Sequence, residues 1–297
     1  MRITESFAET RAAASGIVGL VPTMGFLHEG HLSLIEAALE SSDTVVMSLF
    51  VNPLQFDRDA DLTRYPRDLE RDVALAGAAG ADIVFAPEVG EMYPQEQLTR
   101  VIVAHLSEEM EGPRRPGHFE GVATVVAKLL AGIQPARSFF GRKDAQQLAM
   151  VRRMAADLSF PSEIVGVPIV REIDGLALSS RNIFLSDQER LSALALNTGL
   201  MRAADMVEAG ERDPQAMMRA VLEETAASPG LSVEYVKLAG QDLVKPLYVL
   251  DRPAFLALAA WSGNTRLIDN VHLDAAGDGY VADRGRRLKA ASVLYSQ

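Results

Sequence analysis

Residues 21–35 read VPTMGFLHEGHLSLI and join a predicted strand to a predicted helix. The apolar run Ile17 to Val21 leads into this stretch and predicts a buried strand. Pro22 and Gly25 then end the strand, and a helical pattern of apolar residues begins near Gly30. The stretch therefore predicts a strand that turns directly into a helix.

Two histidines, His28 and His31, stand three residues apart at the start of the predicted helix. A helix N-terminus carries unpaired N–H groups and partial positive charge, so it attracts phosphate. Gly25 and Gly30 remove Cβ atoms where an anion would approach the backbone, and imidazoles supply further donors near pH 7. These features predict a phosphate-binding turn.

Two other interpretations of this turn stay open. The histidine pair could bind a metal ion, but no third ligand is evident nearby, and HEGH lacks the spacing of the HExxH zinc motif. The stretch could also be a plain strand and helix with incidental histidines. We favour phosphate, and from the ligand spacing we expect no protein-held metal. The His-x-Gly-His pattern also resembles the signature of the nucleotidyltransferase superfamily.

Composition limits the function classes. The chain has 297 residues, of which 48% are hydrophobic and 23% charged, as in a soluble globular protein. The absence of cysteine excludes disulfides and thiolate catalysis, and it fits a reducing cytoplasm. A net charge of −11 without a long basic run argues against a nucleic-acid surface. With no bilayer-length apolar run and no signal-peptide core, we expect a cytoplasmic protein and no membrane partner.

Strand-like runs alternate with helical patterns over the first half of the chain, which predicts a Rossmann-like α/β domain: a mainly parallel sheet with helices on both faces. After residues 17–21, the predicted strands are 44–51, 82–86, 99–103, 137–140 and 163–170, and helices are expected at 62–79 and 121–133. Polar residues follow two strand ends, at Asn52–Phe56 and at Gly141–Gln147, where ligands of open α/β sheets collect. The loop 111–119 is either a solvated connector or a phosphate-facing lid.

A smaller α+β domain is expected after the sheet, which places the two domains at 1–169 and 170–297. Ser186 and Glu189 predict a capping box for a long helix to Glu208, and closely spaced strands follow. We expect residues 274–297, rich in glycine, aspartate and arginine, to be a loosely ordered tail. Within the hinge at 171–190, residues 178–182 (LSSRN) offer the donors of phosphate recognition, or they form a hydrogen-bonded loop without a ligand.

Four separated segments agree in order, spacing and chemistry: PTMGFLHEGH (22–31), VNPLQF (51–56), FFGRKDAQQL (139–148) and DGLALSSRN (174–182). Together they resemble the pantoate–β-alanine ligase family, as does AAWSGNTRLIDN at 259–270. The resemblance implies a homodimer and a reaction with ATP, Mg²⁺, pantoate and β-alanine. It also implies that ATP adenylates pantoate and that the amine of β-alanine then attacks the acyl-adenylate. A ligase for another small hydroxy acid, or a nucleotide-binding regulator without turnover, remains the alternative.

The resemblance also implies roles for individual residues. His28, His31, Lys143, Ser179, Ser180 and Arg181 are the expected catalytic residues, which stabilise charge on the phosphates. Gln55 and Gln147 are expected to orient pantoate, with Gln55 also near β-alanine. The full expected ATP-binding set is Met24, Gly25, Phe26, Leu27, His28, Glu29, Gly30, His31, Gly141, Arg142, Lys143, Asp144, Val170, Leu178, Ser179, Ser180 and Arg181.

The chain departs from the family pattern at Arg142, where glutamate is usual, and at Ala145, where an aromatic residue is common. Arg142 either faces the phosphates beside Lys143 or points away, to solvent or to an acid elsewhere. Because neighbouring side chains on a strand point to opposite faces, we expect Arg142 to face away from the ligand that Lys143 faces.

Overall fold

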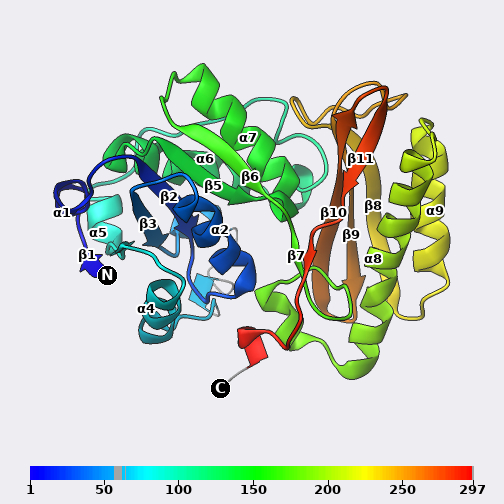
Figure 1. Ribbon diagram of the computed structural model, residues 1–297, viewed down its shortest axis with the longest axis horizontal. Coiled ribbons are helices and arrows are strands. Elements are labelled where there is room, and N and C mark those ends of the chain that lie inside the picture. Colours follow the sequence, from blue (N-terminus) through cyan, green and yellow to red (C-terminus); the bar gives the residue numbers. More distant parts are fainter. Residues whose placement is uncertain (57–61, 64, 296–297) are drawn as a thin grey trace. The chain divides into compact units, whose positions relative to one another are not determined.

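The structure is a computed structural model that describes residues 1–56, 62–63 and 65–295. The chain forms two compact units (Figure 1). The first unit consists of Met1–Gly141 and Gln146–Val167, and the second of Arg142–Ala145 and Pro168–Gln297. Each unit is described by itself.

The first unit is built on a six-stranded sheet in the order β1-β4-β3-β2-β5-β6. Every strand pair in it is parallel, which confirms the predicted parallel sheet. The strands are β1 (Arg2–Thr4), β2 (Val18–Thr23), β3 (Thr44–Leu49), β4 (Ile83–Phe85), β5 (Arg137–Gly141) and β6 (Glu163–Val167).

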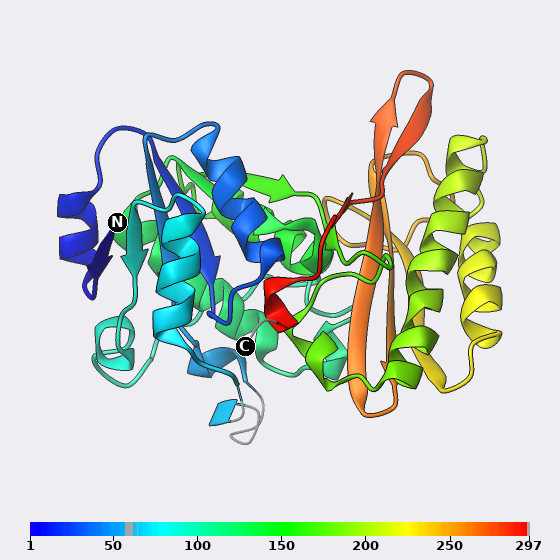
Figure 2. The ribbon, with the colours of Figure 1, turned by 60° about the horizontal axis from the view of Figure 1, so that its bottom comes forward.

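Helices lie on both faces of this sheet (Figures 1 and 2). On one face, α2 buries Leu34, Ile35 and Ala38 against Val45 and Met47 of β3. The opposite face carries α6, which is apolar almost all round and buried along most of its length. The helices are α1 (Phe7–Ala13), α2 (Glu29–Leu39), α4 (Leu69–Ala78), α5 (Val89–Met92), α6 (His118–Ile133) and α7 (Ala145–Asp157), with short 3₁₀ turns η1 (Pro53–Gln55) and η2 (Gly112–Arg114).

Three elements of this unit differ from the prediction. Residues 99–103 form no strand, although their β-branched side chains suit one; Ile102 is largely exposed and the segment pairs with no neighbour in the described sheet. The short strand β1 was not predicted, because three residues carry too little periodicity. The helix expected at 62–79 includes position 64, outside the described residues, and α4 begins only at Leu69, capped by Asp68 after Pro66.

The second unit is an α+β structure, as predicted. Its antiparallel sheet has the order β11-β10-β9-β8, and α8 and α9 pack on one face around a core that includes Leu200, Val221 and Leu256. The predicted capping box of Ser186 and Glu189 is confirmed at the start of α8. The elements are η3 (Arg142–Asp144), β7 (Val170–Arg171), η4 (Ser180–Phe184), α8 (Asp187–Glu208), α9 (Pro214–Ala226), β8 (Leu231–Gly240), β9 (Ala254–Ser262), β10 (Thr265–Ala276), β11 (Gly279–Asp283), β12 (Arg286–Arg287) and η5 (Val293–Tyr295).

Residues 274–295 are not the loosely ordered tail that composition predicts. β10 continues to Ala276 and forms a hairpin with β11, in which His272 pairs with Asp283 and Ala276 with Gly279. β12 then pairs in parallel with β7. The predicted strand 163–170 is likewise split into β6 and β7 around Pro168, since proline cannot donate to a sheet ladder.

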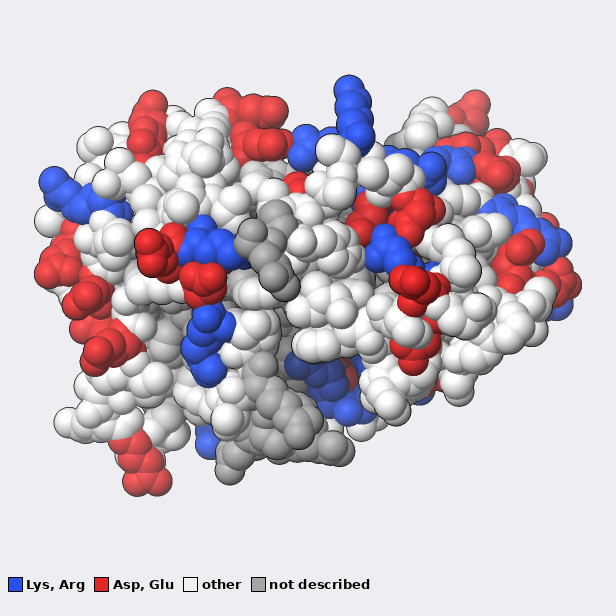
Figure 3. All heavy atoms as spheres, turned by 90° about the horizontal axis from the view of Figure 1, so that it is seen from below, with Lys and Arg blue, Asp and Glu red and all other residues white. Residues whose placement is uncertain are grey.

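Charged side chains of both signs are interspersed over the face drawn in Figure 3. No helix among the described residues is both long enough and apolar enough to cross a bilayer.

Candidate functional site

The turn between β2 and α2 is held in a strained backbone conformation. Gly25 has a φ of 82°, and Phe26 follows with a φ of 53°, which is costly for a residue with a side chain. A Cβ on Gly25 would lie 2.8 Å from Oδ2 of Asp72. Something outside the turn must therefore stabilise this conformation.

The stabilising group is the carboxylate of Asp72 on α4. Its Oδ2 accepts the N–H of Phe26 (2.6 Å) and its Oδ1 accepts the N–H of Leu27 (2.7 Å). Arg71 adds a hydrogen bond to the carbonyl of Leu27 (3.0 Å), and its guanidinium lies over the Phe26 ring. Asp72 is only 3% exposed, and burial raises its pKa even though both hydrogen bonds act to lower it. We call these contacts the Asp72 clamp.

The two histidines at the start of α2 have fixed orientations. His28 is the N-cap residue, and its Nδ1 accepts the N–H of Gly30 (3.1 Å). The N–H of His28 in turn donates to Nδ1 of His31 (3.3 Å), and the two rings stack with centroids 4.1 Å apart. Because each Nδ1 is an acceptor, the proton of each neutral imidazole lies on Nε2. Both rings are thus set to present Nε2–H as a donor.

Gln55, predicted to orient the substrate, is buried in η1 with its carboxamide in a defined direction. The Oδ1 atom of Asn52 accepts the hydroxyl of Tyr93 (2.8 Å) and the N–H of Leu54, so Nδ2 of Asn52 must donate. It donates to Oε1 of Gln55 (3.2 Å) and to the carbonyl of Gly121 (3.1 Å). Nε2 of Gln55 then points to the sulfur of Met24 at 2.8 Å. Gln55 therefore presents an N–H donor beside Met24.

The loop at 111–119, which the sequence leaves open as a connector or a lid, contacts the η1 turn that carries Gln55. Nδ1 of His118 contacts the carbonyl oxygen of Gln55 (3.0 Å). Nη1 of Arg115 contacts the other ring nitrogen of His118, Nε2 (3.0 Å). A guanidinium can only donate, so His118 is a donor at Nδ1. This loop helps to fix the backbone that carries Gln55.

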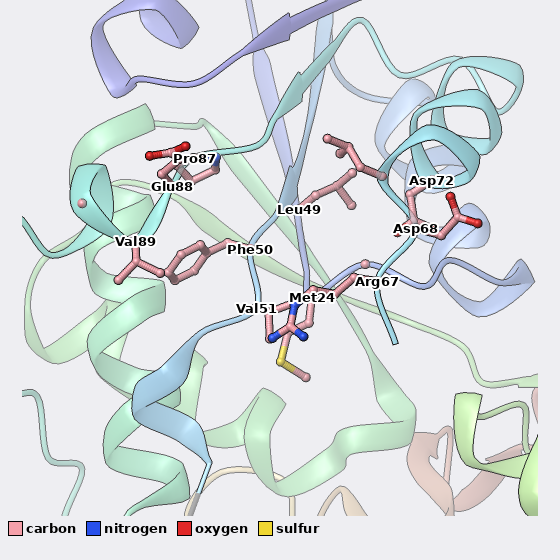
Figure 4. A pocket seen from close by; sticks show the side chains of 13 residues that line it. Met24, Leu49, Phe50, Val51, Arg67, Asp68, Asp72, Pro87, Glu88 and Val89 are labelled. Atoms are coloured by element: carbon pink, nitrogen blue, oxygen red, sulfur yellow. The ribbon is translucent and has the colours of Figure 1, made fainter. Parts of the chain in front are cut away.

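A cavity of about 530 Å³ opens at the carboxyl ends of β3 and β4, where the turn residue Met24 also lies (Figure 4). Figure 4 shows Asp68 and Asp72 on one side of it and Glu88 on the other. Its lining residues are Met24, Gly25, Leu49, Phe50, Val51, Arg67, Asp68, Leu69, Asp72, Pro87, Glu88, Val89 and Gly90. The predicted edge of the sheet thus holds a pocket next to the clamped turn.

In the second unit, β10 holds the backbone on which Lys143 stands. Nδ2 of Asn270 donates to the carbonyls of Arg142 (3.1 Å) and Lys143 (2.7 Å), and Nε2 of His272 contacts the Arg142 carbonyl (3.1 Å). His272 is 2% exposed, and burial, followed by the charge of Arg142, lowers its pKa to about 4. His272 is therefore neutral near pH 7 and holds η3 as a simple N–H donor.

Arg142, the residue that departs from the family pattern, pairs with two acids of the β10–β11 hairpin. Its Nη1 lies 2.8 Å from Oδ2 of Asp274 and 3.0 Å from Oδ2 of Asp283. Burial acts to raise the pKa of Asp274, but hydrogen bonds from Arg142 and Gln241 outweigh it and hold that pKa below its usual value. Of the two expected interpretations, this geometry corresponds to pairing with an acid elsewhere.

The hydroxyl-rich turn of the second unit, Ser179–Arg181, follows Leu178. The N–H of Leu178 donates to the carbonyl of Val170 in β7 (2.9 Å). Ser179 is buried and caps η4, with its Oγ accepting the N–H of Arg181 (3.3 Å). Ser180 is half-buried and Arg181 is exposed. The turn is ordered by its own hydrogen bonds, and the guanidinium reaches outward.

The predicted site residues fall in both units. Met24–His31, Gln55, Gly141 and Gln147 belong to the first unit, and Arg142–Asp144, Val170 and Leu178–Arg181 to the second. Gln147 is half-buried on α7. The side chain of its neighbour Gln146 forms hydrogen bonds with backbone groups of Leu106, Glu109 and Glu111. Among the described residues, no three histidine, aspartate or glutamate side chains gather as a metal-binding group.

Sequence reasoning missed four residues that fix the site. Asp72, Asn52 and Asn270 act directly on the backbone or side chain of a predicted site residue, and Tyr93 holds Asn52. Only Asn52 and Asn270 carried a signal, since both stand inside segments that resemble the family.

A parallel sheet with a histidine-bearing helix N-terminus at its carboxyl edge is typical of nucleotide-binding α/β enzymes. Comparison with known proteins is more specific. The sequence profile described as Pantoate-beta-alanine ligase matches residues 2–272. The pantothenate synthetase of Moorella thermoacetica is 53% identical over 257 residues, which are 86% of this chain and 91% of that protein. That of Heliobacterium modesticaldum is 49% identical over 277 residues, 91% and 99% of the two chains.

Solved structures agree. A pantothenate synthetase from Thermus thermophilus is 48% identical and superposes with a TM-score of 0.86, over 91% of this chain and 98% of that one. A pantoate-beta-alanine ligase from Francisella tularensis, crystallised with beta-gamma ATP and beta-alanine, is 31% identical with a TM-score of 0.73, over 91% and 97%. The chain belongs to the pantoate–β-alanine ligase family.

The Asp72 clamp predicts a phenotype for Asp72→Asn. A carboxamide can accept only through one oxygen, so one N–H of the turn loses its partner, which costs about 1–3 kcal/mol. We expect lower stability in urea and adenylate formation slowed by about tenfold or more, because the strained turn relaxes. Glu70→Gln, an exposed change on the same helix, is the matched control. Adenylate formation at the native rate in Asp72→Asn would show that the clamp does not support the reaction.

The pairing of Arg142 predicts that Arg142→Glu separates stability from binding. Three carboxylates then meet in the hairpin, and we expect a loss of about 1–3 kcal/mol of stability. ATP affinity should change by less than about 1 kcal/mol, as for charges that do not touch the ligand. Arg142→Met, which removes the charge without adding an acid, is the control. Nucleotide titrations over a salt series measure the effect; a larger loss of affinity that shrinks with salt would place Arg142 at the phosphates.

The lowered pKa of His272 predicts acid sensitivity of the second unit. The unfolded imidazole binds a proton below about pH 6.5, whereas the folded one resists it until about pH 4. The contribution of neutral His272 to the free energy of unfolding is therefore complete above pH 6.5. It falls as the pH drops through this window, by roughly 3 kcal/mol in total. Urea unfolding followed by the single tryptophan, Trp261 of β9, measures it. His272→Gln should flatten the profile while the exposed His105→Gln should not; equal profiles for both would refute the assignment.

Proposed function

We propose that the chain joins pantoate to β-alanine in two steps at the expense of ATP. In the first step a pantoate carboxylate oxygen attacks the α-phosphorus, and the bond from that phosphorus to its bridging oxygen breaks to release pyrophosphate. In the second step the amine of β-alanine attacks the acyl carbon, AMP leaves, and the amine loses a proton. The supporting observation is family membership over residues 2–272, together with a clamped histidine turn.

Adenylation needs alignment and charge stabilisation rather than a protein nucleophile. In the first unit we assign phosphate contacts to the Nε2–H donors of His28 and His31 and to the backbone of residues 24–31. In the second unit we assign them to Lys143, to Ser179 and Ser180, and to the exposed guanidinium of Arg181. These groups are donors or cations, which suits an anionic transition state.

Gln55 and Gln147 are assigned to pantoate. The direction of the Gln55 carboxamide supports a donor role, because Asn52 already donates to its oxygen. A neutral donor suits a carboxylate that must lose its charge in the reaction, since a cation would stabilise the ground state. Asp144 is assigned to the ribose or to its own turn, and Val170 to adenine through its backbone.

Family membership supports three further proposals, on Mg²⁺, the homodimer and the cytoplasmic location, and the compact units support a fourth. Mg²⁺ enters with ATP, held mainly by phosphate oxygens and water, which suits a site whose assigned residues are mostly donors and cations. The protein acts as a homodimer in the cytoplasm. The nucleotide-binding domain corresponds to residues 1–169 and a smaller lid domain to 170–297, supported by the change of compact unit after Val167.

Exchange of labelled pyrophosphate into ATP tests the function. Exchange that needs pantoate but not β-alanine supports the proposal. Exchange only with another hydroxy acid would indicate a different ligase, and ATP binding without any exchange would indicate a regulator.

Within this assay we predict that His31→Ala loses adenylation far more than ATP binding. A donor that acts mainly on the transition state typically contributes about 10²–10³-fold to the rate. Single-turnover formation of the adenylate measures the rate and equilibrium titration measures ATP binding. Near-normal adenylate formation in the variant would end the assignment of His31.

A further inference from the structure

The match to the family profile ends at residue 272, yet the described chain continues in an ordered course to Tyr295. We call residues 284–295 the strap. It begins after the β10–β11 hairpin, contains β12 and ends in η5. Figure 1 shows its path alongside β7, in the same unit.

The strap is bound to β7 by its backbone. The N–H of Arg286 donates to the carbonyl of Ile169 (2.7 Å), and the N–H of Leu288 donates to that of Arg171 (2.8 Å). Gly285 makes this approach possible: its φ is 78°, and a Cβ there would lie 2.4 Å from the oxygen of Ile169. The strap thus acts as an extra strand on this edge of β7.

The opposite edge of β7 leads directly to the hydroxyl-rich turn. Arg171 forms an antiparallel bridge with Ala177, and the N–H of Leu178 donates to Val170. β7 therefore lies between the strap and the residues that precede Ser179. A strand fixed on both edges gives the turn that follows a rigid base.

A series of hydrogen bonds connects the end of the strap to the turn. The hydroxyl of Tyr295 donates to Oε1 of Glu172 (2.9 Å), whose carboxylate is only 5% exposed. The same oxygen accepts Nδ2 of Asn182 (2.7 Å), and the N–H of Asn182 donates to the carbonyl of Ser179 (2.9 Å). Tyr295 thus reaches the turn through two intermediate residues.

Arg190 of α8 completes this network. Its Nη2 lies 2.7 Å from Oε2 of Glu172, and its Nη1 donates to the Tyr295 hydroxyl (2.8 Å). Burial raises the pKa of Tyr295 to about 12, so its hydroxyl keeps its proton and donates throughout the neutral range. With Tyr295 in place, the buried carboxylate of Glu172 accepts from all three neighbours.

We propose that the strap positions the turn Ser179–Arg181 for ATP, with Tyr295 as a positioning residue that acts through Glu172 and Asn182. This inference rests on the proposed assignment of that turn to the ATP phosphates.

Tyr295→Phe is the direct test, because it keeps the ring and removes only the hydroxyl. We expect the Kd and KM for ATP to rise about threefold to tenfold, as for the net loss of one typical hydrogen bond. The KM for pantoate should stay the same. A chain stopped after Leu288, which keeps β12 but lacks Tyr295, should show the same selective loss. Tyr248→Phe, at a fully exposed tyrosine of the same unit, is the matched control.

Arg181→Ala separates the two levels of the proposal. If Arg181→Ala weakens ATP binding and Tyr295→Phe lowers only the melting temperature, the strap is merely structural and the inference is wrong. If Arg181→Ala leaves ATP binding intact, the assignment of the turn itself is wrong, and the inference falls with it.

Discussion

The site depends on the bond between one buried carboxylate and two backbone N–H groups. Asp72 holds the turn at Phe26 and Leu27, a turn that contains a residue at positive φ and that would not keep its shape alone. The start of α2 depends on that geometry, because the turn sets the position of His28. His28 in turn caps α2 and orients His31. Burial destabilises the charged form of a carboxylate, and it raises the pKa of Asp72 in the folded protein.

The second unit uses the same strategy with neutral groups. The segment that carries Lys143 is held through its carbonyls by Asn270 and His272, which are both neutral donors. Arg142 is balanced by Asp274 and Asp283. The residues that fix the backbone here are thus different from those that we propose to contact the ligand. Such preorganisation is what a reaction without a protein nucleophile requires.

Local patterns gave the architecture and the motif positions, while contacts between distant residues could not be predicted. The alternation of strands and helices predicted the parallel sheet, and Ser186 with Glu189 predicted the start of α8, because these signals lie within a few residues. Asp72 contacts a turn about 45 positions earlier in the chain, and nothing local marks it. The segment 99–103 shows the reverse failure, since strand-like residues form no strand without a partner.

The segment after Leu273 shows how composition misleads. Its aspartates and glycines are typical of a loop, but Asp274 and Asp283 are the partners of Arg142, and Gly277 makes the hairpin turn. Arg142 therefore forms its ion pairs with the segment that composition predicts to be a loose tail.

We propose that the clamped donors align the pantoate carboxylate with ATP, so that this carboxylate becomes adenylated. Pantoate labelled with ¹⁸O in its carboxylate tests it most directly, by mass spectrometry of the products after a complete turnover with β-alanine. The account predicts one ¹⁸O atom in AMP and none in pyrophosphate. Label in inorganic phosphate with formation of ADP would mean that an acyl phosphate is the intermediate, and it would contradict the account.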